Sequence, residues 1–342
     1  MKHKILLLLC WILVTACPAN TKPPPTTQPN NEPKSGPALA PKAPLLAPLG
    51  AGLGSETRTL LRFVPAQAQL IFLADIERVV KGPLWKSSDG FVKKLSERPE
   101  MVDFVKETGF QPLQDLRGAV LVLGDTSKET TPSLLILRAR FDTKKLEAYL
   151  KKIELPQEEA LYLFARGSAI ALPAPEIILL GDPALVRASA QLTAEATPPA
   201  LQALLGQIDP GRPFSFALQL TSASRAALVL PPEFDGATGA AGWLDLSAGL
   251  EAKAYLEFQT PEQVRLVFED IERTWPAEQQ ALIRRREGKF FEKLRFSVEE
   301  SRLHVSWELS AGDALLFFSE VVGFNLEGLL KAYRVDLPKS QP

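Results

Sequence analysis

The chain has 342 residues, 46% hydrophobic content and a formal net charge of -1. This length holds one large domain or two ordinary ones, and the hydrophobic fraction is ample for a buried core. The 39 basic and 40 acidic residues nearly balance, so composition gives no electrostatic argument for binding nucleic acid. We therefore expect a globular protein without a nucleic-acid partner.

The start of the chain has the three parts of an export signal. Positive charge at residues 2–4 precedes an apolar run over residues 5–14, and small Ala16 stands before Cys17. The run is shorter than the roughly 20 apolar residues that a transmembrane helix needs. We predict a signal peptide over residues 1–16 that is removed on export.

The residues Val14-Thr15-Ala16-Cys17 resemble the lipobox of bacterial lipoproteins. The resemblance implies a diacylglyceryl thioether on Cys17 and, usually, an acyl chain such as palmitate on its new amino group. At about 0.8 kcal/mol per buried methylene, two or three chains make a lasting anchor. In that class, Pro18 rather than Asp after the cysteine implies the outer membrane. An ordinary secretory signal or a bare core segment is the alternative. Cleavage before Cys17 would remove Cys10 with the signal.

Residues 17–54 are predicted to be the lipidated cysteine followed by a disordered linker. Its prolines disfavour both an α-helix and an interior β-strand. They are at positions 18, 23, 24, 25, 29, 33, 37, 41, 44 and 48. In the polyproline form, at about 3.1 Å per residue, the linker could span roughly 100 Å. Such a spacer would hold the folded part clear of the bilayer.

The first folded half is predicted over residues 55–194. Leu70–Ala74 is a continuous apolar run typical of a buried strand, and apolar residues from 91 to 105 recur at helical spacing. Paired strand patterns then precede two helices that begin after Asp142 and Asp182.

After a connection over residues 195–213, the same order returns in residues 214–337, and residues 338–342 form a tail. Each half follows the order strand, helical segment, ββα, ββα, which suggests two related halves. The fold class predicted is α+β, with a largely antiparallel sheet and helices on one face.

Few residues suit catalysis. Without the signal, His304 is the single histidine and Cys17 the single cysteine, so zinc or copper sites and Cys-His pairs lack ligands. We expect no metal, no cofactor and no catalytic residue. His304 alternates with Val305 and Trp307, which predicts a solvated strand face for it. The glycine-rich residues 235–242 lack a phosphate-binding lysine and are predicted to form a loop.

Charged clusters leave two further hypotheses open. Acid pairs at 75 and 77, 158 and 159, and 299 and 300 could serve a hydrolase, although acids at strand ends are common for solvation alone. Arg284-Arg285-Arg286 is predicted to lie at a helix end that Gly288 stops, with contact to anionic lipid or an acidic partner as the alternative.

Residues 63–66 and the loop 108–116 resemble a pattern in uncharacterised bacterial envelope proteins, which implies no activity. The sequence as a whole favours a lipid-anchored envelope protein whose body binds or scaffolds an envelope partner without catalysis. One alternative is a periplasmic carrier of a lipid or other apolar ligand, suggested by the apolar helix at 315–318. The other is a hydrolase that uses Asp and Glu alone.

Overall fold

The computed structural model describes residues 59–82, 97, 99–125, 131–164, 167–192, 196–209, 211–227, 230, 232–283 and 288–320. The expected signal peptide, Cys17, the linker, the helical pattern at 91–95, the three arginines at 284–286 and the tail lie outside these residues.

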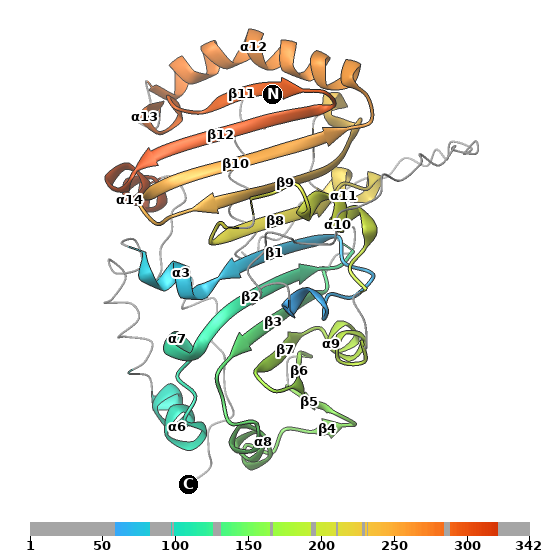
Figure 1. The fold of residues 1–342 in the computed structure, drawn as a ribbon, viewed down its shortest axis with the longest axis vertical. Coiled ribbons are helices and arrows are strands. Elements are labelled where there is room, and N and C mark those ends of the chain that lie inside the picture. Colours follow the sequence, from blue (N-terminus) through green and yellow to red (C-terminus); the bar gives the residue numbers. More distant parts are fainter. Residues whose placement is uncertain are drawn as a thin grey trace, which may run out of the picture.

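Within the described residues, 12 strands form one sheet, and all neighbouring strands are antiparallel (Figure 1). From one edge to the other they are β11 (Arg295–Glu299), β12 (Arg302–Ser310), β10 (Gly249–Phe258), β9 (Ala237–Asp245), β8 (Phe214–Gln219), β1 (Leu70–Asp75), β2 (Leu116–Leu123), β3 (Ser133–Ala139), β7 (Ile177–Gly181), β6 (Ala169–Ala174), β5 (Leu161–Leu163) and β4 (Gln157–Glu158). The expectation of a largely antiparallel α+β fold is confirmed.

The described helices connect and cover these strands. They are α3 (Ile76–Lys81), α6 (Pro99–Thr108), α7 (Pro112–Asp115), α8 (Thr143–Lys152), α9 (Pro183–Ala190), α10 (Pro199–Leu205), α11 (Ser222–Ala227), the 3-10 helix η1 (Pro232–Phe234), α12 (Pro261–Ile283), α13 (Gly288–Phe291) and α14 (Ala311–Glu320).

The two predicted halves share this sheet as two arms. The first arm runs outward from β1 and the second from β8, and the arms join where β1 pairs with β8, with Phe72 opposite Phe216. Hydrogen bonding across the central pair makes the sheet continuous, so the core is shared between the arms.

Helices cover both faces of the sheet, so the expectation of helices on one face is wrong. Ile71 and Leu73 of β1 belong to a buried cluster with residues of α9 and α10; we call this side the α10 face. Leu70 and Phe72 point to the opposite side, the α12 face, where α12 also packs. The physical reason is that Leu70–Ala74 is apolar at every position, and such a strand needs cover on both faces.

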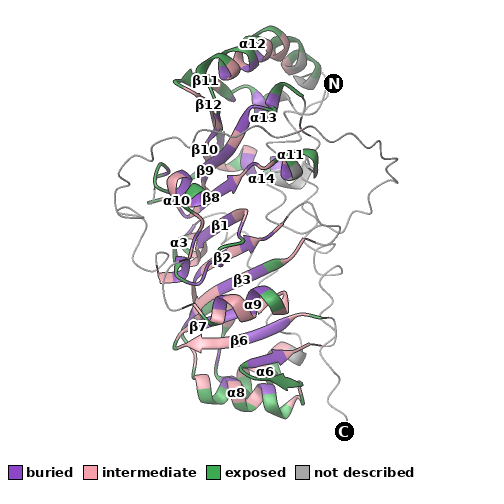
Figure 2. Ribbon diagram, turned by 90° about the vertical axis from the view of Figure 1, so that its right-hand side faces the viewer, coloured by how far each residue is buried: buried purple, intermediate pink, exposed green. Residues whose placement is uncertain are grey.

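The α12 face is covered separately at its two ends. Near one edge, Leu146 and Leu150 of α8 pack over the first arm. Near the other edge, Val264 and Ile271 of α12 and Phe317 of α14 pack over the second arm. Buried residues follow the strands, while the outer sides of α8 and α12 are exposed (Figure 2).

Several helix ends lie where neighbouring residues predicted them. Asp142 and Asp182 accept hydrogen bonds from the first backbone amides of α8 and α9, as N-cap residues do. Gly109 follows α6 with φ of 70°, a conformation that glycine adopts without a Cβ penalty. The connection at 195–213 contains the short helix α10.

Two glycine-based expectations are wrong. Residues 237–242 lie in β9, within the predicted loop, because their small side chains allow close packing. A Cβ on Gly242 would stand 2.5 Å from the carbonyl oxygen of Lys253 in β10. Gly288 begins α13 rather than simply stopping the helix before it.

Candidate apolar binding site

The α12 face carries a row of facing side chains that crosses the sheet. Because directly paired residues in antiparallel strands share a face, the pairing places these side chains on one side. The row runs Leu121–Phe72–Phe216–Gly242–Ala254–Val305, and the adjacent row runs Ala119–Ala74–Phe214–Leu244–Ala252–Trp307.

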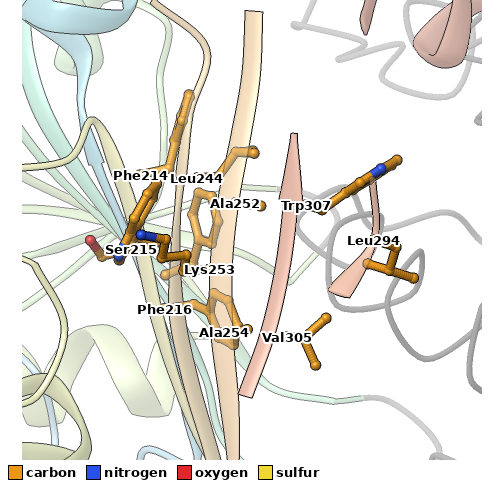
Figure 3. Close-up of a pocket in the computed structure, with 12 residues that line it drawn as sticks. Phe214, Ser215, Phe216, Leu244, Ala252, Lys253, Ala254, Leu294, Val305 and Trp307 are labelled. Atoms are coloured by element: carbon orange, nitrogen blue, oxygen red, sulfur yellow. The ribbon is translucent and has the colours of Figure 1, made fainter. Parts of the chain in front are cut away.

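A hollow opens over these rows in the second arm (Figure 3). Its free space is about 620 Å³, including the part open to solvent. Its lining is mostly apolar and comes from five strands and the segment after α13; it consists of Phe72, Phe214, Ser215, Phe216, Trp243, Leu244, Ala252, Lys253, Ala254, Leu294, Val305 and Trp307.

The floor of the hollow is low because small residues follow one another across the strands. Gly242 and Ala254 are paired in the first row, and Ala252 stands beside them in the second row. Close contact between the β9 and β10 backbones leaves no room for a larger residue at Gly242. The rings of Phe72 and Phe214, with centroids 5.8 Å apart, rise on one side of this floor.

A packed aromatic group forms the opposite wall. The Trp307 ring stacks on Phe291 with centroids 5.5 Å apart and meets the edge of Phe317 at 4.8 Å. Its indole nitrogen donates a hydrogen bond to the carbonyl oxygen of Phe290. Since Trp307 is held from three sides, this wall is rigid. Phe317 lies in the apolar helix that suggested a carrier, and here it supports the wall from behind.

The polar lining residues turn their side chains away from the hollow. Lys253 lies between Ala252 and Ala254, so its side chain projects from the α10 face, where its ammonium group lies 5.6 Å from the Trp243 ring centroid. Ser215 alternates in the same way with Phe214 and Phe216. The hollow therefore offers apolar side chains on its floor and walls.

An arginine on the α10 face holds the strands beneath the hollow. The Arg212 guanidinium lies 3.9 Å from the centroid of the Trp243 ring and bonds Asp245 and Glu251, each at 3.1 Å, and Asp209 at 3.0 Å. These contacts join the start of β8 to β9 and β10.

Asp245 is ionised more readily than an ordinary aspartate. Burial alone would raise its pKa, but hydrogen bonds from Ser247 and Arg212, together with the charge of Arg212, outweigh burial and lower the pKa of Asp245. The carboxylate therefore stays charged and keeps its bond to Arg212.

His304 lies where the alternation predicted. Its side chain shares the α10 face with Ser306, is 33% exposed, and has its Nε2 atom 3.5 Å from a Glu299 carboxylate oxygen. It is close to Tyr255, whose hydroxyl donates to the carbonyl oxygen of Leu204 and whose pKa is raised by burial. The histidine is on the side of the sheet opposite the hollow.

The predicted acid pairs lie apart from the hollow, at strand ends and turns. Asp75 accepts a hydrogen bond from the Arg78 amide as the N-cap of α3. Glu158 pairs with Arg187 at 3.4 Å. Glu159 and Glu300 have φ of 53° and 51°, which places them in tight turns. These positions agree with the alternative that the acids lie at strand ends and turns because water solvates them there.

Within the described residues no group of three or more His, Cys, Asp or Glu is arranged to hold a metal ion. In the same part of the chain, no helix has both the length and the apolar content to cross a membrane. No protein-family model, curated protein or solved structure matches the chain.

Sequence reasoning missed the hollow. The signal for it is the alternation of small residues, Gly242 in β9 and Ala252 and Ala254 in β10, opposite large ones in neighbouring strands. This pattern can be recognised only when the pairing register of the strands is known.

Proposed function

We propose that the protein is a lipid-anchored cell-envelope protein whose body binds an apolar ligand without catalysing a reaction. The anchor rests on the lipobox-like residues Val14-Thr15-Ala16-Cys17, and Pro18 after the cysteine favours the outer over the inner membrane. The observation that carries the binding part is the apolar hollow on the α12 face. The proline-rich residues 18–54 would set the distance between the body and the bilayer.

The composition of the hollow supports an apolar ligand. Its lining is mostly apolar and aromatic, as the linings of ligand pockets usually are. A ligand with a polar group could leave that group in solvent at the open side. A lipid acyl chain fits this chemistry, which brings the proposal close to the carrier alternative.

We also propose that the two arms derive from one duplicated unit. The strand orders β1-β2-β3-β7-β6-β5-β4 and β8-β9-β10-β12-β11 support this, since in each arm the first three strands are neighbours in chain order and the arm's last strand then pairs with the third. A two-fold axis at the Phe72–Phe216 pair would relate the arms.

Under the proposed symmetry, the first arm has larger residues at the positions that form the floor of the hollow in the second arm. This symmetry would relate Leu121 and Leu135 of the first arm to Gly242 and Ala254 of the second. Leucine thus fills in one arm the positions that glycine and alanine leave open in the other.

Filling the hollow tests the binding proposal. Ala254→Leu places a larger side chain on the floor, at the position where the first arm has Leu135. Lys253→Leu is the matched control, because it adds the same residue next in the strand but on the α10 face. In native mass spectrometry of protein purified from the envelope, the unaltered protein and the control should carry an apolar molecule that the Ala254→Leu variant lacks. Equal occupancy in all three proteins would show that the hollow is not the site.

A further inference from the structure

The sheet ends in two different edge strands. At one end, β4 has only two residues, Gln157 and Glu158, so it offers little backbone for further pairing. At the other end, β11 has five residues, and four of them are exposed. β12 pairs with its inner side, and no strand within the described residues pairs with its outer side (Figure 1). The outer side of β11 is therefore an open edge of the sheet.

The pairing with β12 decides which backbone groups of β11 point to the open edge. Opposite residues of antiparallel strands alternate between hydrogen-bonded and non-hydrogen-bonded pairs. Glu299 and Arg302 flank the two-residue turn that joins the strands, so they form a hydrogen-bonded pair, as residues beside such a turn do. Ser297, two residues earlier, also bonds to β12. The amide and carbonyl groups of Phe296 and Val298 therefore point outward.

The helix over this end of the sheet leaves the edge accessible. α12 packs over β10 and β12 through residues such as Val264, and it reaches β11 at Phe296, whose ring centroid lies 5.5 Å from that of Trp275. Val298, on the same face nearer the turn, is 36% exposed. Ser297, on the opposite face, is exposed as well. A further strand can therefore approach β11 beside these two residues.

The sequence of β11, Arg-Phe-Ser-Val-Glu, is complementary to itself in the antiparallel direction. Pairing of two copies about Ser297 places Arg295 of each copy opposite Glu299 of the other. The same register places Phe296 opposite Val298, the residues whose backbone groups point outward. It is the register that pairs all five residues of the strand. Opposite charges directly across two strands stabilise their pairing, and like charges destabilise it.

We propose that the protein forms a dimer by antiparallel pairing of β11 with β11 of a second copy, which makes the two 12-stranded sheets continuous. Backbone hydrogen bonds at Phe296 and Val298 join the copies, and the Arg295–Glu299 ion pairs close the contact at both ends. A five-residue pairing is smaller than the interface of most stable dimers, so this dimer is reversible. The hollow has no lining residue in β11, so the contact is independent of the binding proposal.

A disulfide at the centre of the contact tests its register. Ser297 faces its own copy in a non-hydrogen-bonded pair, where Cα atoms are about 4.5 Å apart, within the range that a disulfide spans. The sequence has two cysteines, Cys10 and Cys17, so with both replaced by serine the full chain carrying Ser297→Cys has a single thiol. Mild oxidation should link most of this variant into dimers. Ser301→Cys, in the turn after β11, is the matched control and should stay monomeric, because the register separates its two copies by about 27 Å.

Exchanging the charges tests the complementarity in sedimentation experiments on the cysteine-free chain. Arg295→Glu leaves acidic residues at both ends of the contact, and Glu299→Arg leaves basic ones. Each single change should raise the dissociation constant of the dimer about tenfold, which corresponds to about 1.4 kcal/mol. The double variant should recover the original constant. An equal mixture of the two single variants should form mixed dimers, because each then meets opposite charges.

The mixture separates contact between copies from effects within one copy. Arg295 also donates to the carbonyl oxygen of Leu294 at 3.0 Å, and Glu299 lies 3.5 Å from His304, so each single change also affects its own chain. Weakening in both single variants without mixed dimers would show that the charges act within the chain and would overturn the proposal. Equal disulfide yields from Ser297→Cys and Ser301→Cys, or a monomer at every concentration, would overturn it too.

Discussion

Replacing Arg212 with alanine should destabilise the sheet beneath the hollow by about 2–3 kcal/mol. The guanidinium stacks on Trp243, and a partly desolvated contact of this kind contributes about 1–2 kcal/mol. The Asp245 side chain is only 16% exposed, so the loss of its partner adds about 1 kcal/mol for an unsatisfied charge. The pairs with Asp209 and Glu251 are more exposed and contribute little.

Urea unfolding followed by tryptophan fluorescence measures this loss. Arg212→Lys is the informative control, because it keeps a positive charge but loses the planar stacking and the forked hydrogen bonds. We expect the lysine variant to recover less than half of the stability lost in the alanine variant. A loss below about 0.5 kcal/mol for Arg212→Ala, within the range of ordinary surface changes, would refute the reasoning.

Two further predictions concern the same network and the anchor. The lowered pKa of Asp245 means that its stabilising contribution is present above its ordinary pKa of about 4 and is lost as pH falls through the lower, folded-state pKa. Unfolding measured from pH 6 to pH 2.5 should therefore show a steeper loss of stability for the unaltered protein than for Asp245→Asn, and equal slopes would contradict this. Cys17→Ser should abolish fatty-acid labelling in cells and leave the signal uncleaved; labelling that persists would remove the anchor from the account.

Features encoded by neighbouring residues could be predicted from the sequence. Asp142 and Asp182 precede helices because their carboxylates reach the first free amides a few residues on. The alternation in residues 303–309 placed His304 on the face opposite Trp307 for the same local reason. These signals need no knowledge of the rest of the chain.

Features that depend on distant pairing could not be predicted in this way. The joining of the arms requires Phe72 to pair with Phe216, far along the chain, and no local pattern specifies that partner. Gly242 looks like a loop residue until the close approach of β10 explains it. The hollow depends on both facts, because its floor lies in β9 and β10 of the second arm while its aromatic rim includes Phe72 of β1 in the first.

Titration of the purified body with a fluorescent fatty acid tests the central claim most directly. The unaltered protein and the Lys253→Leu control should bind it with the same dissociation constant. The Ala254→Leu variant should bind at least about tenfold more weakly, which corresponds to about 1.4 kcal/mol. Absence of saturable binding to the unaltered protein, or equal binding by all three proteins, would contradict the account of the hollow as a binding site.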